Sequence, residues 1–239
     1  MKASVIIPCY NEENRIFPTL NYLLSYIKTL DFIHEIIFVD DGSNDNTKGI
    51  IQEFRENSSI VYINLTTHKG KGAALKAGCS KATGDILIFL DADLPYDLSC
   101  LKNISTIYSK DYNQITIGDR TLPNSKIVHG YGWVRVLSGK IFSLLIKGIL
   151  ALPYPDTQCG LKVLPRQVID MILKKSVIDS FTFDVEILCM AYIHNIPINR
   201  IPVIFNHSNG SKINIIKDSF TMFIDLLKIK RRKDIGLYT

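Results

Sequence analysis

The chain has 239 residues and a formal net charge of +5, with 46% hydrophobic and 21% charged residues. This length and composition fit one α/β domain with an ordinary core, and the charge suits phosphorylated ligands or an anionic membrane surface rather than nucleic acid. The five cysteines are scattered and form no C-x-x-C pair, which argues against zinc and for free thiols in a reducing cytosol.

Neither a signal peptide nor a membrane-spanning helix is expected. The chain enters a strand-like segment, Ala3–Pro8, almost at once, and no uncharged run reaches the roughly 18–20 apolar residues that cross a bilayer. The nearest candidate, Trp133–Leu152, contains Arg135, Lys140 and Lys147. We therefore expect a cytoplasmic protein.

The first 90 residues alternate between short apolar runs, which predict strands, and longer segments with apolar residues at helical spacing, which predict helices. The predicted order is strand Val5–Pro8, helix Glu13–Leu30, strand Glu35–Val39, helix Asp45–Glu56 capped by Ser43 or Asn44, strand Ile60–Leu65, helix Ala73–Ala82 and strand Asp85–Leu90. Right-handed crossovers between such units predict a mostly parallel, doubly wound sheet.

The second half is less regular, and no repeat, low-complexity tract or linker separates it from the first. The predicted order is helix Asp97–Lys110, strand Gln114–Gly118, a basic and apolar segment Ile127–Leu152, strand Leu161–Leu164, a helix from Pro165, helix Thr182–Asn195, strand Ile198–Phe205 and helix Ile215–Arg232. A single α/β domain over residues 1–239 is therefore expected.

Two carboxylates, Asp91 and Asp93, end the continuous apolar run Asp85–Leu90. Such a run predicts a strand buried on both faces, and ligands bind at the carboxyl ends of strands in open α/β sheets. A hard divalent cation that holds phosphate oxygens would neutralise the pair, which suggests a metal–diphosphate site. The alternative is that Asp91 caps the next turn while Asp93 is solvated.

Polar loops also follow the other early strands. Tyr10–Glu12 follow the first strand, Asp40–Asp41 the second, and Lys69–Gly72 the third. Glycines let a backbone approach phosphate, lysines add positive charge, and aspartates after a second strand suit a base or ribose, so the loops indicate a nucleotide diphosphate. Neither the dinucleotide fingerprint G-x-G-x-x-G nor a Walker P-loop is present, which argues against dehydrogenases and P-loop kinases.

Two later segments combine apolar and basic residues: Ile127–Leu152, and the helix Ile215–Arg232 with its basic cluster Lys228–Lys233. Helices of this kind lie in membrane interfaces with their lysines reaching the headgroups, and Tyr131 and Trp133 favour that position. The alternatives are a core helix with snorkelling lysines and a solvated basic tail. We expect peripheral association with the cytosolic face of a membrane.

The loops resemble those of family 2 glycosyltransferases, which are inverting enzymes with the GT-A fold. The matching stretches occur in the family's order: Val5–Glu12, Asp40–Ser43, Lys69–Ala73 and Asp91–Asp93. Three later stretches resemble the dolichyl-phosphate glucosyltransferase branch, which transfers glucose from UDP-glucose to dolichyl phosphate: Asp156–Lys162, Phe183–Glu186 and Gly210–Lys212. We expect two departures from that branch: no N-terminal anchor, and a different sequence at Leu94–Asp97.

The resemblance implies a Rossmann-like GT-A fold, with a nucleotide-sugar-binding half (1–120) and an acceptor and membrane-interface half (121–239). The implied nucleotide-sugar-binding residues are Pro8, Tyr10, Glu12, Asp40, Asp41, Lys71, Asp91, Ala92 and Asp93. Asp91 and Asp93 would also hold Mg²⁺ or Mn²⁺ on the diphosphate. The implied acceptor and phosphate-binding residues are Arg120, Arg135, Gln158, Glu186 and Lys212, and the implied catalytic residues are Asp91, Asp93, Asp156 and Asp184.

The reaction expected from the resemblance is inverting transfer of a sugar, with UDP-glucose the first candidate donor, to dolichyl or undecaprenyl phosphate. A GDP-mannose donor, as in dolichyl-phosphate mannose synthases, is one alternative. A non-lipid hydroxyl acceptor is another, and it would need Asp156 or Asp184 as a general base. A sugar nucleotidyltransferase is disfavoured because the loop Cys9–Glu12 is not Gly-rich, and a non-catalytic binding module because both Asp91 and Asp93 are retained.

Overall fold

The computed structural model describes residues 1–54, 59–129, 133–206 and 215–239. The strands are β1 (Ala3–Cys9), β2 (Ile33–Asp40), β3 (Ile60–Asn64), β4 (Ile86–Phe89), β5 (Ile115–Asp119), β6 (Lys126–His129), β7 (Lys162–Pro165), β8 (Ile198–Pro202) and β9 (Ile204–Asn206). The helices are α1 (Ile16–Ile27), α2 (Thr47–Glu53), α3 (Lys71–Lys81), the 3₁₀ turn η1 (Leu98–Leu101), α4 (Ile104–Lys110), α5 (Trp133–Leu150), α6 (Arg166–Lys175), α7 (Phe183–Ile193) and α8 (Ile215–Asp234).

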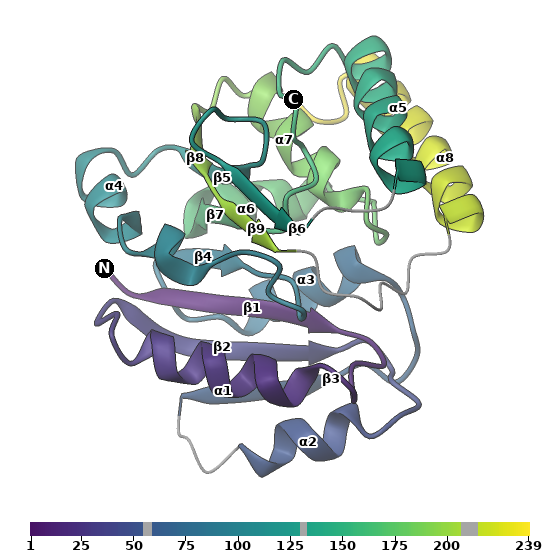
Figure 1. The fold of residues 1–239 in the computed structure, drawn as a ribbon. Helices are drawn as coiled ribbons and strands as arrows, with labels where there is room; N and C mark the ends of the chain where they lie inside the picture. Colours follow the sequence, from purple (N-terminus) through teal and green to yellow (C-terminus); the bar gives the residue numbers. More distant parts are fainter. Residues whose placement is uncertain (55–58, 130–132, 207–214) are drawn as a thin grey trace.

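Seven strands form one central sheet in the order β3-β2-β1-β4-β7-β5-β8. The pairs β1–β2, β1–β4, β2–β3 and β5–β8 are parallel, whereas β7 runs antiparallel to both β4 and β5. The expected mostly parallel α/β sheet is thus confirmed, with one reversed strand at its centre. The arrowheads of β1 and β2 lie on one side of the molecule, so the polar loops that follow these strands lie on that side (Figure 1).

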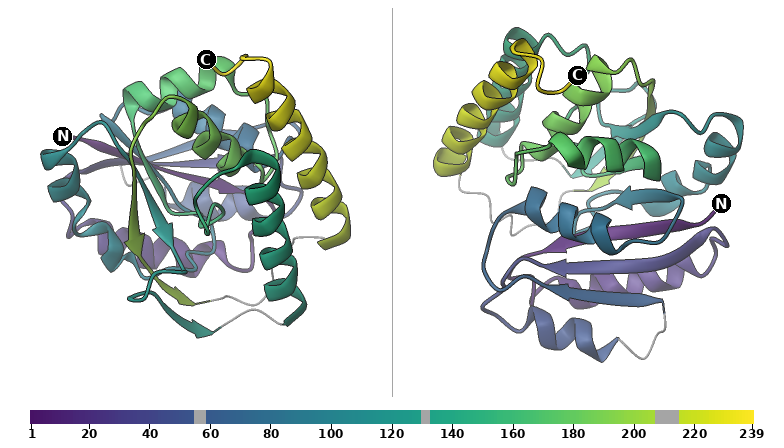
Figure 2. Two further views of the ribbon diagram at one scale, coloured as in Figure 1. Left: turned by 90° about the horizontal axis from the view of Figure 1, so that it is seen from above. Right: turned by 180° about the vertical axis from the view of Figure 1, so that it is seen from behind.

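Side chains that alternate along the central strands build two hydrophobic layers, one on each face of the sheet. Ile6 belongs to the layer under α3, α6 and α7, whereas its neighbours Val5 and Ile7 belong to the layer under α1 and η1. Figure 2 shows these helices on both faces of the sheet. Burial on both faces explains why the strand sequences are continuous apolar runs.

Several helix ends and caps differ from the sequence-based prediction. The segment predicted as one helix from Asp97 is a 3₁₀ turn followed by α4, and the Asp97 carboxylate accepts a hydrogen bond from the Ser99 backbone N–H at 2.8 Å. α1 begins at Ile16 rather than Glu13. Ser43 does not cap α2, because its hydroxyl accepts from the Asn11 backbone N–H at 2.8 Å instead.

The predicted strand Ile198–Phe205 is two strands, with the break at Val203. β8 ends the central sheet, whereas β9 pairs in parallel with β6 in a separate two-stranded sheet. The backbone N–H of Val203 donates to the Ser125 hydroxyl at 3.1 Å, outside the ladder of the central sheet. The sequence analysis predicted no strand at β6.

α5 and α8 pack against each other on the side of the molecule toward which β1 and β2 point (Figures 1 and 2). Within the described residues, neither these nor any other helix combines the length and apolar character needed to cross a membrane. The side chains of residues 133–135 and 215–218, and the whole of residues 130–132 and 207–214, lie outside the description. The expectations for Tyr131, Trp133, Arg135 and Lys212 fall there.

Candidate active site

The carboxyl ends of β1, β2 and β4 bring the first-half loops to one edge of the sheet. Asp40 ends β2 and pairs in register with Cys9 at the end of β1, and Asp91 follows β4 by two residues. Parallel strands share a polarity, so loops far apart in sequence meet at this edge. This is the arrangement expected from the sequence.

Asp40 and Asp41 are buried and hold two different loops. The Asp40 carboxylate accepts from the Tyr62 hydroxyl at 2.8 Å and from the Ser43 backbone N–H at 2.8 Å. The Asp41 carboxylate accepts from the backbone N–H groups of Lys69 and Gly70 at 2.8 and 2.7 Å. Asp41 therefore fixes the start of the loop that carries Lys71.

Gly70 is required where the Asp41 hydrogen bonds end and α3 begins. Its φ of +111° lies in the region that favours glycine, and a Cβ there would lie 2.5 Å from the Asp179 carbonyl oxygen. The Ala73 backbone N–H donates to that same carbonyl at 3.1 Å. A second-half loop thus closes against the lysine loop.

Tyr10 stacks on His68, an aromatic residue that the sequence analysis did not select. The ring centroids are 4.0 Å apart and the rings are nearly parallel, at 23°. His68 Nδ1 lies 2.8 Å from the Asp41 carboxylate, although half of the His68 side chain is exposed. An exposed stack beside Asp40 and Asp41 is a surface on which a flat base can lie. Pro8 is half-buried near the end of β1.

Lys71 lies between two carboxylates from opposite halves of the chain. Its Nζ is 2.9 Å from Asp91 Oδ1 and 3.0 Å from Asp184 Oδ2. The buried Lys162 reaches the other oxygen of Asp184, Oδ1, at 2.9 Å. Burial alone would lower the pKa of Lys71, but the charges of Asp184 and Asp91 outweigh it and raise that pKa.

Asp91 is held on both of its oxygens. Lys71 contacts Oδ1, and the buried Tyr96 hydroxyl donates to Oδ2. Burial favours a raised pKa for Asp91, but Lys71 and Tyr96 reverse this effect and lower that pKa. Gly160 lies directly against this carboxylate, since a Cβ at Gly160 would be 1.9 Å from Asp91 Oδ2. The stretch Asp156–Lys162 thus closes on Asp91 at a position that only glycine fits.

Asp93 and Glu12 share one cation, Arg15. Arg15 donates to both Glu12 oxygens at 2.8 and 2.7 Å, and its Nη1 lies 3.3 Å from Asp93 Oδ2. Glu12 is buried, whereas the side chain of Asp93 is 22% exposed. Ala92, between the two aspartates, is buried. The sequence analysis did not select Arg15.

Asp156 and Arg120 form a two-point ion pair. Arg120 donates from Nε to Oδ2 at 2.7 Å and from Nη2 to Oδ1 at 2.8 Å, and its backbone N–H also donates to Oδ2 at 2.9 Å. Burial opposes ionisation of Asp156, but these contacts outweigh it and lower its pKa. Gln158 is half-buried beside this pair.

Glu186 differs from its expected place on the acceptor side. It is fully buried, and its carboxylate accepts from the Ser176 hydroxyl and from the backbone N–H groups of Val177 and Ile178 at 3.0 and 3.2 Å. The hydroxyl of the buried Tyr238 donates to it at 2.6 Å. Two residues after Asp184 on α7, Glu186 therefore faces the packed interior, where it fixes the loop after α6.

The acidic residues fit a divalent cation only if other oxygens complete its coordination. Among the described residues, no group of three His, Cys, Asp or Glu side chains is arranged to hold a metal. Asp91 and Asp93 supply hard carboxylate oxygens on one turn, and Asp93 is partly accessible. Mg²⁺ and Mn²⁺ sites of this kind use one or two carboxylates plus substrate phosphates and water.

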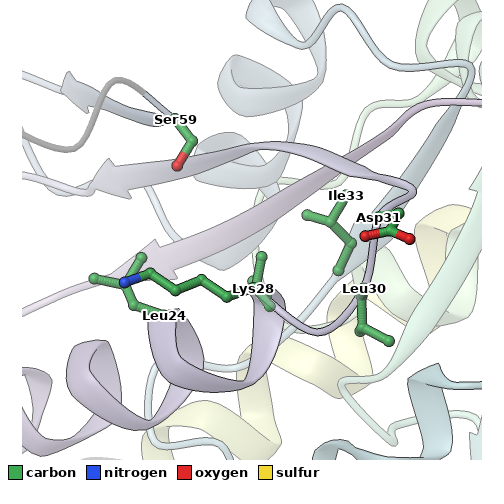
Figure 3. A pocket seen from close by; sticks show the side chains of 7 residues that line it. Leu24, Lys28, Leu30, Asp31, Ile33 and Ser59 are labelled. Atoms are coloured by element: carbon green, nitrogen blue, oxygen red, sulfur yellow. The ribbon is translucent and has the colours of Figure 1, made fainter.

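A separate hollow of about 280 Å³ lies between the end of α1 and the start of β2 (Figure 3). Its lining residues include Lys28, Asp31 and Ser59, and none of the residues discussed above contributes to it. It opens near the amino-terminal end of β2, whereas Asp40 ends that strand. The hollow therefore takes no part in the candidate site.

A family model described as glycosyl transferase family 2 matches residues 4–172. Over 99% of its length the chain is 33% identical to a dolichyl-phosphate beta-glucosyltransferase of Trichomonas vaginalis, of which it covers 75%. It is 32% identical over 98% of its length to the dolichyl-phosphate beta-glucosyltransferase of Saccharomyces cerevisiae, of which it covers 76%.

Solved structures share the fold at lower identity. Glucosyl-3-phosphoglycerate synthase from Mycobacterium tuberculosis, in complex with uridine diphosphate, superposes with a TM-score of 0.71 at 18% identity, covering 96% of this chain and 80% of that one. The same enzyme was also crystallised with Mn²⁺ and UDP-glucose. Staphylococcus aureus TarS superposes with a TM-score of 0.63 at 20% identity, covering 97% of this chain and 66% of that one.

Proposed function

This chain belongs to glycosyl transferase family 2, and we propose that it transfers glucose from UDP-glucose to a polyprenyl phosphate, with dolichyl phosphate as the first candidate acceptor. Relatives named dolichyl-phosphate beta-glucosyltransferase match nearly its whole length, which supports glucose as the sugar and dolichyl phosphate as the acceptor. The chain spans about three quarters of those relatives.

The donor would lie along the carboxyl edge of the sheet. The Tyr10–His68 stack would receive the base, while Asp40, with Pro8 beside it, would contact the nucleoside. Lys71 carries a permanent positive charge between Asp91 and Asp184, and it would face the diphosphate. Asp91 and Asp93 would hold Mg²⁺ or Mn²⁺, which as a Lewis acid stabilises the charge that develops on a departing diphosphate.

The contacts of Asp156 and Asp184 are the observation on which the proposed phosphate acceptor rests. A hydroxyl acceptor needs a carboxylate that accepts its proton, with a pKa near the working pH. Arg120 engages both oxygens of Asp156 and lowers its pKa, and Lys71 and Lys162 contact the two oxygens of Asp184. A phosphate monoester is already anionic at neutral pH and needs no such base, so this arrangement favours a phosphate acceptor.

The proposed reaction forms a bond from an acceptor phosphate oxygen to the anomeric carbon of glucose, while the bond from that carbon to the UDP oxygen breaks. Attack from the opposite face inverts the anomeric centre. The electron pair of the broken bond stays on UDP, beside Lys71. Arg120, together with Arg135 and Lys212 of the sequence-based proposal, would neutralise phosphate, and Gln158 would contact the sugar or acceptor.

The acceptor lipid would be reached from a membrane surface. α5 exposes Leu137, Ile141 and Leu144, and α8 exposes Phe220 and Leu227. Exposed basic residues accompany these apolar side chains: Lys140 and Lys147 on α5, and Lys228 and Arg231 on α8. Apolar and cationic residues on paired helices suit the interface of an anionic leaflet, so we place the protein peripherally on the cytosolic face.

The test compares two acceptors that differ only in the phosphate. Purified protein with Mn²⁺ and UDP-glucose is given a short polyprenyl phosphate or the corresponding polyprenol, and glycolipid is measured by mass spectrometry. We expect product from the phosphate alone, and we expect Asp93→Asn to reduce it at least a hundredfold, in the range seen when one stabilising group is removed. Product from the polyprenol would contradict the proposal.

A further inference from the structure

Arg15, the residue before α1, occupies an unusual place beside the proposed metal-binding turn. Its guanidinium makes a parallel two-point contact with Glu12, at 2.8 and 2.7 Å, and a longer contact of 3.3 Å with Asp93 Oδ2. Its side chain is only 19% exposed, so these carboxylates lie in a partly dehydrated setting. The first-strand loop is therefore tied electrostatically to a residue 78 positions later.

The two proposed metal ligands differ in what holds them. The Asp91 oxygens are engaged by Lys71 and Tyr96, whereas the contact between Arg15 Nη1 and Asp93 Oδ2 is longer, at 3.3 Å. A guanidinium and a divalent cation both bind carboxylate oxygens, and because both are positively charged they repel each other. Binding of a cation at Asp93 must therefore weaken the Arg15–Asp93 contact.

Glu12 already holds the guanidinium by two hydrogen bonds while Nη1 contacts Asp93. Two-point contacts between arginine and carboxylate are stronger and more directional than single ones, so Arg15 can leave Asp93 and remain neutralised. The Glu12 backbone N–H donates to the Thr47 hydroxyl at 2.6 Å, which fixes this acceptor in place. Glu12 thus binds Arg15, and this contact was not part of the nucleoside-binding role expected for Glu12.

We propose that Arg15 is a resident counter-charge of Asp93 and that a divalent cation must displace the Nη1 contact with Asp93, which leaves the guanidinium on Glu12. Arg15 is then a positioning residue that sets the affinity for the metal ion and keeps that affinity low until the donor diphosphate adds its own oxygens. The inference rests on the proposed function, because it takes Asp93 to be a metal ligand.

The proposal predicts opposite effects for two neutralising substitutions. Arg15→Gln removes the competitor, so Mn²⁺ should bind the nucleotide-free protein about tenfold more tightly. Glu12→Gln removes the alternative partner and leaves Arg15 on Asp93, so Mn²⁺ should bind at least threefold more weakly. Lys76→Gln is the control, because it also removes one positive charge. That charge lies on α3, the helix that begins with Lys71, where Lys76 contacts Asp179.

The measurement is the free Mn²⁺ signal in electron paramagnetic resonance, titrated at fixed ionic strength without nucleotide and again with UDP. The gain for Arg15→Gln should shrink when UDP is present, and Lys76→Gln should bind Mn²⁺ like the unmodified protein. The inference is overturned, while the metal site stands, if Arg15→Gln binds Mn²⁺ no more tightly than the unmodified protein or than Lys76→Gln. If Asp93→Asn binds Mn²⁺ as tightly as the unmodified protein, the metal assignment itself fails, and the inference fails with it.

Discussion

At the scale of single residues, four carboxylates of the site are each paired with at least one cation. The pairs are Asp91 with Lys71, Asp93 with Arg15, Asp156 with Arg120, and Asp184 with both Lys71 and Lys162. A buried charge without a partner is costly, so each member holds its counterpart in place. The same pairing lowers the pKa of Asp156, which makes it poorly suited to accept a proton, and it places a lysine on each oxygen of Asp184.

The Asp156–Arg120 pair should therefore be measurable as stability. Asp156→Asn leaves the Arg120 guanidinium without its carboxylate, and we expect a loss of about 2–4 kcal/mol in unfolding free energy at pH 7, measured by urea denaturation. The pKa of Asp156 is lowered in the folded state, so its contribution is present above the ordinary carboxyl pKa of about 4 and is lost as pH falls through the folded value.

The difference between the two proteins should consequently stay constant from about pH 5 to 8 and shrink below about pH 4. Asp170→Asn is the matched control, because Asp170 is half-exposed and its contact with Arg166 is 4.0 Å long. We expect a change below about 0.5 kcal/mol there. Equal losses for Asp156→Asn and Asp170→Asn would contradict the role given to the pair.

The acidic members of this set could be selected from the sequence, as could two of their four cationic partners, Lys71 and Arg120. Asp91 and Asp93 end an apolar run, and Asp156 and Asp184 lie in stretches that resemble a known branch. Arg15 and His68 have no such local signal, and Lys162 lies in the stretch Asp156–Lys162 without any indication of its contact with Asp184, because the contacts of Arg15 and Lys162 with these aspartates join residues far apart in the chain. Tyr96 lies in Leu94–Asp97, the stretch that differs from the dolichyl-phosphate glucosyltransferase branch. That difference gave no indication of the hydrogen bond from Tyr96 to Asp91.

At the scale of elements, the first half was predictable because each strand ends in its own polar loop. Parallel strands bring those ends together, and the structure has Asp40, Lys71 and Asp91 on one edge. The reversed direction of β7 was not predictable, since the composition of four buried residues does not indicate which way a strand runs between β4 and β5. The four residues of β6 were not predicted as a strand, and the three residues of β9 were not separated from β8.

The helices α5 and α8 should provide membrane binding through their exposed apolar side chains. We expect Leu144→Glu combined with Phe220→Glu to lower the fraction that floats with phosphatidylcholine–phosphatidylserine vesicles about tenfold or more, because two of the most exposed apolar side chains of these helices become charged. High salt should weaken binding of the unmodified protein by screening its basic residues.

Phe17→Glu is the control for this measurement, because Phe17 is half-exposed on α1, a helix outside the α5–α8 pair. It should float like the unmodified protein. If the unmodified protein stays wholly out of the vesicle fraction at low salt, or if Phe17→Glu reduces flotation as much as the double variant, the membrane surface is not formed by α5 and α8.

At the scale of the whole molecule, the two halves of the chain meet at the proposed diphosphate position. Lys71 and Asp91 come from the first half, Asp184 and Gly160 from the second, and they lie within direct contact distance. From the resemblance to the family, the donor role was assigned to the first half of the chain and the acceptor role to the second half. That one lysine joins both halves emerges only from the folded chain, because Lys71 and Asp184 are 113 residues apart.

The most direct test of the proposed reaction is a donor screen. The protein is incubated with Mn²⁺, a short polyprenyl phosphate and, separately, UDP-glucose, UDP-N-acetylglucosamine, UDP-galactose or GDP-mannose, and the glycolipid is identified by mass spectrometry. We predict glucosyl product from UDP-glucose and at least tenfold less product from each other donor, since the loss of one matched sugar contact costs about that factor. Preferential transfer from GDP-mannose, or release of UDP without any glycolipid, would contradict the proposed reaction.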